Sequence, residues 1–410
     1  MVKEFNTIDD FDLKDKVVLL RIDINAPVDP NGGLILDDTR MKLHSPTIKE
    51  LCELGAKIVI LTHQSRPGKK DFIPLKAHAN VLSENLNLPV NYVDSIFSSK
   101  AIEKIKSLKQ GEILLLENVR FFSEESLNRS PKEQSKTLLV KKLVPYADVF
   151  INDAFAAAHR SQLSLVGFTH LIPSAAGRLM ENELKIIENA LENVQRPCIF
   201  ILGGMKPEDS IEVIENVLNN GSADYILPTG IVANIFLLSN DVDIGKVNIE
   251  FIKDKGFYDL VKTSKNILKK YKDKIILPVD LAIEDNGKRV DVSIKNIPNK
   301  YIFDIGVKTI KEYAKYIRKA KTIFANGPAG VFENPEFAIG TEDILNTIAQ
   351  SDGFSIIGGG HIAAATTALG YDKYMNHISS GGGASITLLS GKKLVAVEAL
   401  KDAYKRELKS

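Results

Sequence analysis

Arginines and clustered glycines, two residue types that bind anions, divide this chain between them. Arginine side chains bind phosphate and carboxylate groups through a planar fork of N–H donors. Glycine-rich loops that open onto helices bind phosphate through backbone N–H groups and the helix dipole. The arginines that follow apolar runs lie in the first half, at Arg21, Arg40, Arg66, Arg120 and Arg160, and the glycine clusters lie mainly in the second half, at Gly203-Gly204, Gly327-Pro328, Gly358–Gly360 and Gly381–Gly383. This division predicts two different anion sites that face one another.

Short, continuous apolar runs recur along the chain, and amphipathic stretches such as Thr47–Leu54 and Ile211–Leu218 separate them. Continuous runs are typical of strands that are covered on both faces, as in parallel sheets. The predicted strands are Val17–Ile24, Ile58–Leu61, Ile113–Leu116, Val149–Ile151, Ile199–Leu202, Ile226–Leu227, Ile275–Val279, Ile302–Ile305, Thr322–Phe324 and Ser355–Ile357. The pattern predicts an α/β fold with two Rossmann-like parallel-sheet domains.

With 410 residues, the chain is longer than one usual domain. A long helical pattern over Ala175–Asn193 lies between the two α/β halves, and Val397–Leu408 is a second helical pattern at the C-terminus. We therefore expect an N-terminal domain over 1–172, a hinge helix over 173–194 and a second domain over 195–392. The last segment, 393–410, is expected to pack back toward the first domain.

Charge and cysteine content exclude several classes of protein. The net charge is only +1, which argues against binding to nucleic acid or a membrane surface through bulk charge. No apolar stretch reaches membrane-spanning length, and the N-terminus lacks the apolar region of a signal peptide. Cys52 and Cys198 lie far apart, so a disulfide framework or zinc site is not indicated. The composition predicts a soluble, cytoplasmic protein.

In the first half, polar residues follow the predicted strands at the edge where parallel sheets bind ligands. The alternation in Arg21–Asn25 puts Arg21, Asp23 and Asn25 on one face. The remaining loop residues are His63, Gln64, Ser65 and Arg66 after the second strand, Arg120 after another, Arg160 after the next, and Arg40 at the start of a helix. Any one arginine could simply pair with a nearby acid, but their shared location favours a basic binding edge.

In the second half, glycine loops follow the strands instead. Gly203-Gly204-Met205-Lys206 joins a strand to a helix without forming a Walker A motif. Glu333 follows the loop that starts at Gly327, and its carboxylate could accept hydrogen bonds from ribose hydroxyls. Three consecutive glycines at Gly358–Gly360 cost backbone entropy that a simple turn does not require, so close approach of a phosphate chain explains them better.

Taken in order, these stretches resemble the phosphoglycerate kinase family, in particular its archaeal branch, over nearly the whole chain. The matching motifs are Arg21–Pro27, Asp37–Arg40, His63–Pro67, Leu116–Phe121, Asn152–Phe155, His159-Arg160, Gly203–Lys206, Asn326–Pro328, Gly330–Glu333 and Gly381–Ser385. The resemblance implies a two-lobed hinge enzyme that transfers a phosphoryl group reversibly between 1,3-bisphosphoglycerate with ADP and 3-phosphoglycerate with ATP. It also implies that magnesium accompanies the nucleotide.

The resemblance also implies which residues form the two sites. The N-terminal lobe is expected to bind 3-phosphoglycerate or 1,3-bisphosphoglycerate through Arg21, Asp23, Asn25, Arg40, His63, Gln64, Ser65, Arg66, Arg120 and Arg160. The C-terminal lobe is expected to bind ADP or ATP through Gly203, Lys206, Glu333, Gly358, Gly359, Gly360, His361, Gly381 and Gly382. Arg40 and Lys206 are the expected catalytic residues. A monomer or small homo-oligomer is expected.

Three positions depart from the family pattern. Ser210 stands where many members have a second lysine, His361 where many have an aspartate that contacts magnesium, and Gln162 in place of a second histidine. Imidazole is a poor ligand for magnesium, which prefers oxygen. The metal ligands therefore stay unassigned, with Asp209 as a candidate carboxylate.

Two other functions compete with the kinase. A nicotinamide-dependent dehydrogenase would use the loose G-x-G-x-x-A at Gly358, but the acid expected at the end of the following strand is missing. A non-catalytic anion-binding protein with two lobes would explain the arginines. It would not explain Lys206, Glu333 and the glycine loops.

Overall fold

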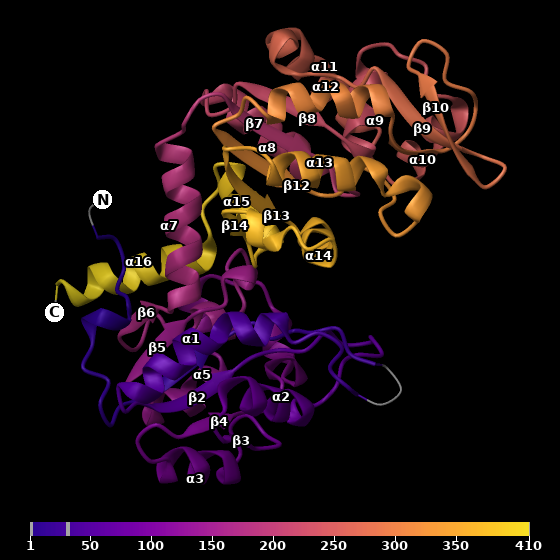
Figure 1. Cartoon of the computed structure of the whole chain (residues 1–410). Coiled ribbons are helices and arrows are strands. Elements are labelled where there is room, and N and C mark those ends of the chain that lie inside the picture. The colour runs from indigo at the N-terminus through magenta and orange to yellow at the C-terminus, as the bar shows by residue number, and fades with distance from the viewer. Residues whose placement is uncertain (1–2, 30–32, 410) are drawn as a thin grey trace. The chain divides into compact units, whose positions relative to one another are not determined.

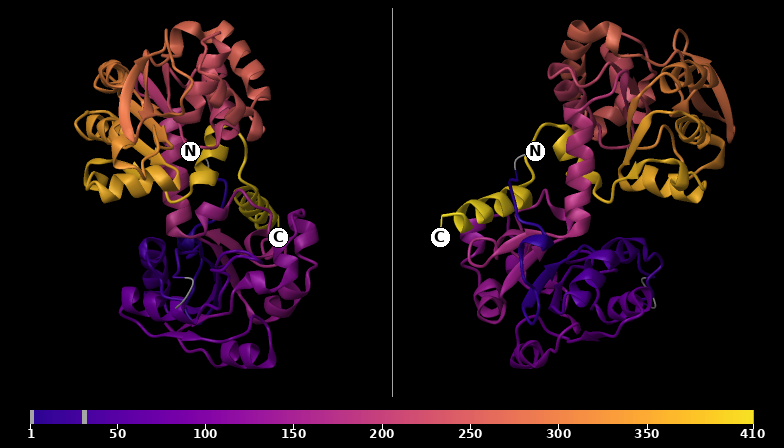
Figure 2. Two further views of the ribbon diagram at one scale, coloured as in Figure 1. Left: turned by 90° about the vertical axis from the view of Figure 1, so that its right-hand side faces the viewer. Right: turned by 60° about the vertical axis from the view of Figure 1, so that its left-hand side comes forward.

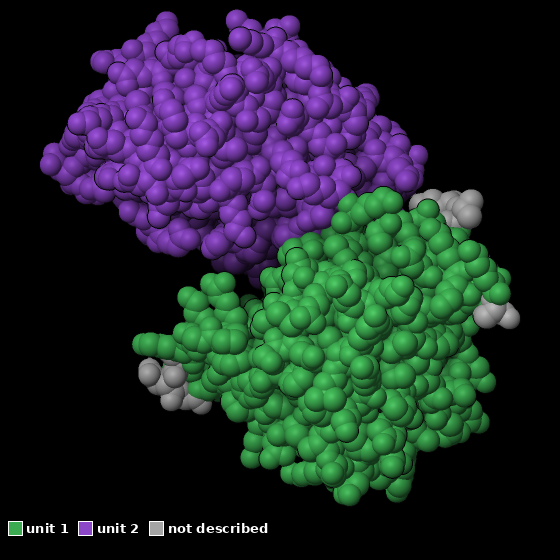
Figure 3. Space-filling view, turned by 180° about the vertical axis from the view of Figure 1, so that it is seen from behind, with its two compact units in different colours: residues 1–185, 393–410 green, residues 186–392 purple. Residues whose placement is uncertain are grey.

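The computed structural model describes residues 3–29 and 33–409, which form two compact units (Figure 3). Unit 1 consists of the residues up to Lys185 together with those from Lys393 onward, and unit 2 consists of Ile186–Lys392. Residues 1–2, 30–32 and 410 of the predicted domain segments lie outside the described residues. Each unit is built on a parallel sheet, so the predicted α/β class is confirmed.

Unit 1 contains a six-stranded parallel sheet in the order β3-β4-β2-β1-β5-β6 (Figure 1). The strands are β1 (Val17–Arg21), β2 (Lys57–Leu61), β3 (Val90–Tyr92), β4 (Ile113–Leu115), β5 (Val149–Asn152) and β6 (Ser174–Ala176). Alternate residues of β1 face opposite sides: Val18 and Leu20 pack with α1 (Thr39–Glu53) and α2 (Lys76–Leu86), and Leu19 packs with α3 (Ser99–Ser107) and α5 (Leu138–Leu143). Burial on both faces explains why these strands are continuous apolar runs.

Unit 2 contains a five-stranded parallel sheet in the order β14-β13-β12-β7-β8. The strands are β7 (Cys198–Leu202), β8 (Tyr225–Pro228), β12 (Thr322–Asn326), β13 (Phe354–Gly358) and β14 (His377–Ile378). One face packs against α8 (Pro207–Asn219), α9 (Gly230–Ser239), α11 (Asp259–Tyr271) and α15 (Gly382–Leu389), and the other against α12 (Val307–Ile317), α13 (Ile339–Ala349) and α14 (Gly360–Ala368). The short helix α10 (Lys246–Asp254) precedes α11.

A three-stranded antiparallel sheet in unit 2, in the order β10-β9-β11, was not predicted. It consists of β9 (Asp280–Asp285), β10 (Lys288–Ser293) and β11 (Ile302–Ile305). The assignment of Ile302–Ile305 to a parallel sheet is therefore wrong, and the predicted strand at Ile275–Val279 is reduced to one bridge between Ile226 and Ile275. The missed signal is Asn286-Gly287, whose φ values of 54° and 76° suit a two-residue hairpin turn.

The long helix α7 (Arg178–Glu192) continues unbroken from unit 1 into unit 2 (Figure 2). It begins three residues later than the predicted Ala175, because Ser174–Ala176 pairs with β5 as an edge strand. Arg178 anchors this start in unit 1 through its two ion pairs at 2.6 Å, one to Glu50 and one to Asp9. The helical prediction is correct for the remainder of the segment.

The C-terminal helix α16 (Val395–Glu407) belongs to unit 1. Its Glu407 carboxylate accepts hydrogen bonds from Asn6 Nδ2 at 2.8 Å and from the Ser174 amide at 3.3 Å. The Arg406 guanidinium donates to the Thr169 carbonyl at 2.7 Å. These bonds hold the end of the chain against β6. Among residues 3–29 and 33–409, no helix combines the length and the apolar content needed to cross a bilayer.

Tyr313→Phe tests how α12 is held to the sheet of unit 2. The buried Tyr313 hydroxyl lies 2.8 Å from the Pro228 carbonyl oxygen and 2.9 Å from that of Ile276. The two carbonyls share the single hydroxyl proton, and its removal leaves the buried Pro228 carbonyl without this donor, so the free energy of unfolding should fall by about 1–3 kcal/mol. Urea unfolding followed by circular dichroism measures this. Tyr316→Phe on the same helix, where the half-buried ring packs on Tyr225, should change stability by less.

Candidate active site

Side-chain amides join the loops that follow β1, β2 and β4 in unit 1. Gln64 binds the backbone of Ala26 twice, accepting from its amide at 3.0 Å and donating to its carbonyl at 2.9 Å. Asn25 Oδ1 accepts from the Ser65 amide at 2.8 Å, and Asn118 Oδ1 accepts from the Gln64 amide at 3.2 Å. These contacts fix the polar turn after β2 and support Ser65 in a left-handed conformation with φ of 55°.

Asp23 and Arg40 form the centre of this edge. Arg40 lies in the first turn of α1, and its Nη1 is 3.0 Å from Asp23 Oδ2. Burial alone would raise the pKa of the Asp23 carboxyl, but interaction with the neighbouring His63 first, and then with the guanidinium groups of Arg40 and Arg21 and with the Asn25 amide, holds it well below its usual range. The Arg40 side chain is 40% exposed, so it can bind Asp23 and still present N–H donors to a ligand.

Arg21 lies beneath this edge and is fully buried. Its Nε donates to Ser164 Oγ at 2.9 Å, and its Nη2 lies 3.0 Å from His63 Nδ1. Burial lowers the pKa of His63 well below its usual range, so the imidazole is neutral and Nδ1 accepts from the guanidinium. The placement favours a role for Arg21 in orienting His63 rather than in touching a ligand.

The cationic side chains of this edge repel one another. Burial first, and then the positive charges of Arg160 and Arg21, lower the pKa of Arg120 to about 10. The same guanidinium groups disfavour a charge on His63. Arg66 and Arg160 are exposed. An anion bound among these groups would relieve their repulsion, so the edge suits a ligand with several negative charges.

In unit 2, glycine loops interlock at the carboxyl ends of β7, β8 and β12. The Gly203 amide donates to the Asn326 carbonyl at 2.9 Å, and the Gly204 amide donates to the Pro328 carbonyl at 3.0 Å. A Cβ on Gly203 would lie 2.1 Å from Thr229 Oγ1, and one on Gly327 would lie 2.4 Å from the Gly203 oxygen. These two glycines are therefore required by the packing of the loops themselves.

The glycine triplets after β13 and β14 also meet. A Cβ on Gly382 would lie 3.1 Å from the Gly359 Cα, and Gly359 itself has φ of 92°. Gly360 differs from both, because a Cβ there would meet no atom within 4 Å and its φ is not in the left-handed region. The packing of the folded protein therefore gives no reason for a glycine at this exposed first residue of α14. A ligand that approaches the backbone closely would give such a reason.

Asn326 belongs to the matching motif Asn326–Pro328, but the sequence prediction assigns it no role in the site. It ends β12 beneath the glycines, and a Cβ on Gly358 would lie 3.1 Å from its Nδ2. This buried Nδ2 has no hydrogen-bond partner within the part of the chain that the structure describes. A buried donor without a partner is costly, so it indicates a group that a ligand would satisfy.

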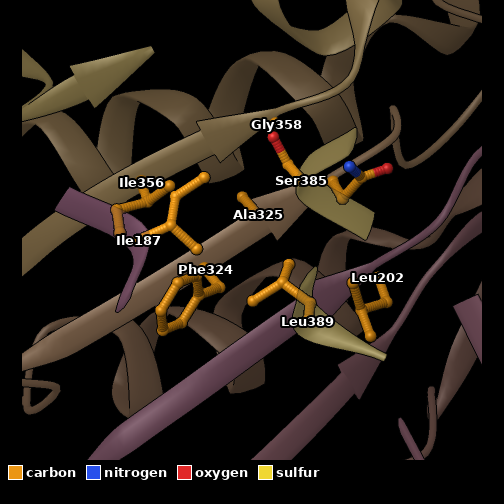
Figure 4. A pocket seen from close by; sticks show the side chains of 9 residues that line it. Ile187, Leu202, Phe324, Ala325, Ile356, Gly358, Ser385 and Leu389 are labelled. Carbon is orange, nitrogen blue, oxygen red and sulfur yellow. The ribbon is translucent and has the colours of Figure 1, made fainter. Parts of the chain in front are cut away.

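An apolar cavity lies next to these loops, as Figure 4 shows. Its empty volume is about 290 Å³, which includes space open to solvent. Leu202, Phe324, Ile356 and Leu389 line it together with Ile187 of α7, and Asn326 and Gly358 are also part of its lining. Apolar walls do not suit a phosphate chain, so phosphate groups are expected at the glycine amides instead.

The remaining residues of the predicted nucleotide site differ in their exposure to solvent. Lys206 precedes α8 as its N-cap residue, and Lys206, Glu333 and His361 are exposed. Ser210 on α8 is buried, so this position faces the core and offers no charge to a ligand. Gly381, which precedes α15, is buried, and Gly382 begins that helix.

Comparison with known proteins decides the family. A model of the family described as phosphoglycerate kinase matches residues 8–392. The phosphoglycerate kinase of Methanothermobacter thermautotrophicus is 60% identical over 400 residues, covering 98% of this chain and 97% of that protein. The chain belongs to the phosphoglycerate kinase family.

Solved structures of the family agree with this assignment. The crystal structure of phosphoglycerate kinase from Pyrococcus horikoshii OT3 has a TM-score of 0.92 at 44% identity, covering 98% of this chain and 99% of that one. The structure from Coxiella burnetii has a TM-score of 0.82 at 32% identity, covering 97% and 99%. The resemblance to archaeal members is confirmed, and the dehydrogenase and binding-protein alternatives lose their support.

Family membership establishes the reaction. Phosphoglycerate kinase transfers a phosphoryl group reversibly between 1,3-bisphosphoglycerate with ADP and 3-phosphoglycerate with ATP, so this chain is a phosphotransferase with a carboxyl group as acceptor. The nucleotide and the triose are therefore its substrates.

Arg21→Met tests the buried support of the basic edge. Ser164 Oγ receives the Arg21 Nε hydrogen bond and donates to Glu125 Oε1 at 2.6 Å, so the buried guanidinium and carboxylate share this hydroxyl. Burial already raises the pKa of Glu125, and without Arg21 this carboxyl loses its strongest compensating charge, so the free energy of unfolding should fall by about 3–5 kcal/mol. Chemical denaturation measures it.

The double variant Arg21→Met with Glu125→Gln is the control for this charge effect. Removing both charges should restore part of the lost stability, because no unpaired ion then stays buried. If the double variant is as unstable as Arg21→Met, loss of packing rather than of charge compensation is responsible.

Proposed function

We propose that the basic edge of unit 1 binds the triose and that the glycine loops of unit 2 bind the nucleotide. The mutual repulsion of Arg21, Arg120 and Arg160 carries this proposal, because a bound phosphate or carboxylate would relieve it. The other supports are the unsatisfied Asn326 Nδ2 and the open space at Gly360, which suit the phosphates of ADP or ATP.

In the triose site, the proposed ligand-binding side chains include both buried and exposed groups of the basic edge. They are Asp23, Asn25, His63, Arg66, Arg120 and Arg160, with Arg40 directed to the transferring phosphoryl group. Gln64 and Ser65 hold the backbone of this edge through the contacts to Ala26 and Asn25. Arg21 acts one step further back, by fixing His63.

In the nucleotide site, backbone amides at the start of α14 and α15 bind the phosphates. The proposed set is Gly203, Lys206, Glu333, Gly358, Gly359, Gly360, His361, Gly381 and Gly382, to which the structure adds Asn326. Helix N-termini favour anions because their amides lack partners and the helix dipole is positive there. Glu333 is assigned to the ribose, because its exposed carboxylate can accept hydrogen bonds from the ribose hydroxyls.

Phosphoryl transfer of this kind needs no covalent enzyme intermediate. The protein must align the attacking and leaving oxygens and offset the charge that spreads over the equatorial oxygens of the transferring group. Arg40 from unit 1 and Lys206 from unit 2 supply this positive charge. Direct transfer requires the two sites to meet, and we propose that bending at α7 closes the domains around the substrates and excludes water.

Magnesium fits this site as an ion carried by the nucleotide. Its chemistry when bound is to neutralise phosphate oxygens during transfer. Among residues 3–29 and 33–409, no three side chains of histidine, cysteine, aspartate or glutamate gather as a metal site. Magnesium usually keeps several waters and takes one or two carboxylates together with phosphates. Asp209, half-buried in the first turn of α8, can supply one carboxylate, and His361 is a poor candidate.

The cellular context is also part of the proposal. Cys52 and Cys198 are free thiols, which suits the cytoplasm. We expect a monomer or small homo-oligomer, which sedimentation analysis of the purified chain would determine.

Arg40→Ala tests the catalytic assignment. We expect kcat to fall by at least ~100-fold, the scale of losing one electrostatic stabiliser of a transition state. A coupled assay of ATP formation from 1,3-bisphosphoglycerate measures it. Arg66→Ala is the matched control, because it removes an exposed arginine of the same edge and should mainly raise the KM for the triose. Near-normal turnover of Arg40→Ala would remove Arg40 from the mechanism.

Gly360→Ala tests whether this glycine serves the nucleotide. The added methyl group meets open space in the folded protein, so the melting temperature should not fall. A phosphate that approaches the amide closely would be displaced, and we expect the Kd for ADP to rise about tenfold or more, equivalent to ~1.4 kcal/mol. Calorimetric titration measures it, and 3-phosphoglycerate titrated separately is the control. Unchanged ADP affinity would contradict the assignment.

A further inference from the structure

A chain of buried hydrogen bonds runs from the backbone of Asp23 to the start of α7. His44 on α1 is 2% exposed, and its Nε2 lies 3.1 Å from the Asp23 amide nitrogen. Its Nδ1 lies 2.7 Å from Asp153 Oδ2. The other oxygen of Asp153 accepts from the amides of Leu179 at 2.9 Å and Met180 at 3.3 Å.

The partners of His44 determine its protonation. The Asp23 amide can only donate, so His44 Nε2 must accept and carries no proton. Nδ1 then carries the proton and donates it to Asp153. The imidazole is therefore neutral, and the Asp23 amide and the Asp153 carboxylate together hold it in a single tautomer.

Asp153 caps α7 from a distant part of the chain. It follows β5, and its own amide donates to the Arg21 carbonyl at 2.8 Å. A Cβ on Gly177 would lie 2.3 Å from Asp153 Oδ1, so a glycine just before α7 gives the carboxylate room to reach the helix amides. A buried carboxylate at a helix N-terminus is favoured by the helix dipole and by the amides that lack partners there.

Arg40 and His44 hold Asp23 from two sides. They lie four residues apart on α1, so both project from the same face of the helix. Arg40 binds the carboxylate of Asp23 at 3.0 Å, and His44 binds its amide. The position of Asp23, and with it that of the Arg40 guanidinium, is thus fixed from the interior of unit 1.

We propose that His44 is a positioning residue for phosphoryl transfer, which acts by fixing Asp23 and through it Arg40. This inference rests on the proposed role of Arg40. A misplacement of about 1 Å in a reacting group can cost on the order of 100-fold in rate. His44 touches no substrate in this arrangement. Its hydrogen bond to Asp153 also connects Asp23 to the start of α7.

Two polar substitutions of His44 separate positioning from packing. In His44→Asn the short amide keeps a donor for Asp153 but does not reach the Asp23 amide. In His44→Gln the amide is one methylene longer and offers both a donor and an acceptor, as imidazole does. We expect kcat to fall about tenfold or more in His44→Asn, by the loss of orientation, and to stay near wild type in His44→Gln. The KM for ADP should change in neither.

Ile48→Ala is the control for simple destabilisation. Ile48 is fully buried on α1 one turn beyond His44 and packs in the core beneath the sheet. Its truncation should lower the melting temperature without changing kcat of the folded enzyme. If His44→Asn keeps wild-type kcat, or if His44→Gln loses as much as His44→Asn, the proposal is overturned.

A double-mutant cycle with Arg40→Ala shows whether His44 acts through Arg40. If it does, His44→Asn should have little further effect on kcat once Arg40 is absent, so the two losses are strongly non-additive. Additive losses alongside a large effect of Arg40→Ala alone would overturn the inference and leave the proposed function intact. An Arg40→Ala variant with normal turnover would instead overturn the proposed function itself.

Discussion

The repulsion among the positively charged arginines of the basic edge is the physical constraint on which unit 1 depends. Arg21, Arg120 and Arg160 repel one another, and burial removes much of the water that would screen them. Glu125 and Ser164 below the edge, and Asp23 within it, offset part of this positive charge. They are too few to pair with all the outer N–H donors of Arg40 and Arg120. A multiply charged anion completes the balance. The arginines of the basic edge can stay close together because buried groups of the core, among them Glu125 and Ser164, offset part of their charge.

Unit 2 meets the same requirement for anion binding without clustered charge. Its sheet ends in loops whose glycines pack so closely that a Cβ at Gly203 or Gly327 would clash with neighbouring loop atoms. The close packing brings the amides at the start of α14 and α15 next to one another, since Gly382 lies against Gly359. Neutral amides carry no desolvation penalty comparable to that of a buried guanidinium. In the proposed assignment, the nucleotide phosphates are therefore bound by backbone amides and the triose by side chains.

The sequence supports the class of fold and the composition of both edges, because strand burial and ligand-binding loops leave patterns in the order of residues. The continuous apolar runs correctly indicate parallel sheets. The strand alternation expected over Arg21–Asn25 is not observed, because β1 ends at Arg21, and Asp23 and Asn25 are instead linked in the following loop, where the Asn25 amide donates to Asp23 Oδ1 at 3.2 Å. The antiparallel sheet is not predicted, although Asn286-Gly287 is a typical hairpin turn. The sequence analysis assigns the strand to the apolar run Ile275–Val279 instead of to β9, which follows it. The start of α7 was misplaced because Ser174–Ala176 pairs with β5, a long-range contact with no local signal.

Long-range contacts also explain why sequence patterns do not single out His44. Its sequence neighbours show only a helix, whereas its partners come from residues 21 and 109 positions away along the chain. Asn326 is similar, since its importance follows from a buried Nδ2 left without a partner rather than from its place in a motif. Residue type and spacing can identify groups that reach outward from strand ends. The groups that hold them in place become visible only when the fold brings distant segments together.

With the role proposed for Arg40, the interior of unit 1 bears on catalysis as directly as its surface does. Arg40 is half-exposed and long, so a single ion pair to Asp23 would leave it considerable freedom. Its orientation becomes defined because Asp23 is itself held at its amide by His44, and His44 by a carboxylate that also accepts two amides of α7. Each group in this series has a partner on both sides and little exposure to solvent. An exposed arginine can therefore be placed as accurately as a buried one, provided that the residue it pairs with is anchored in the core.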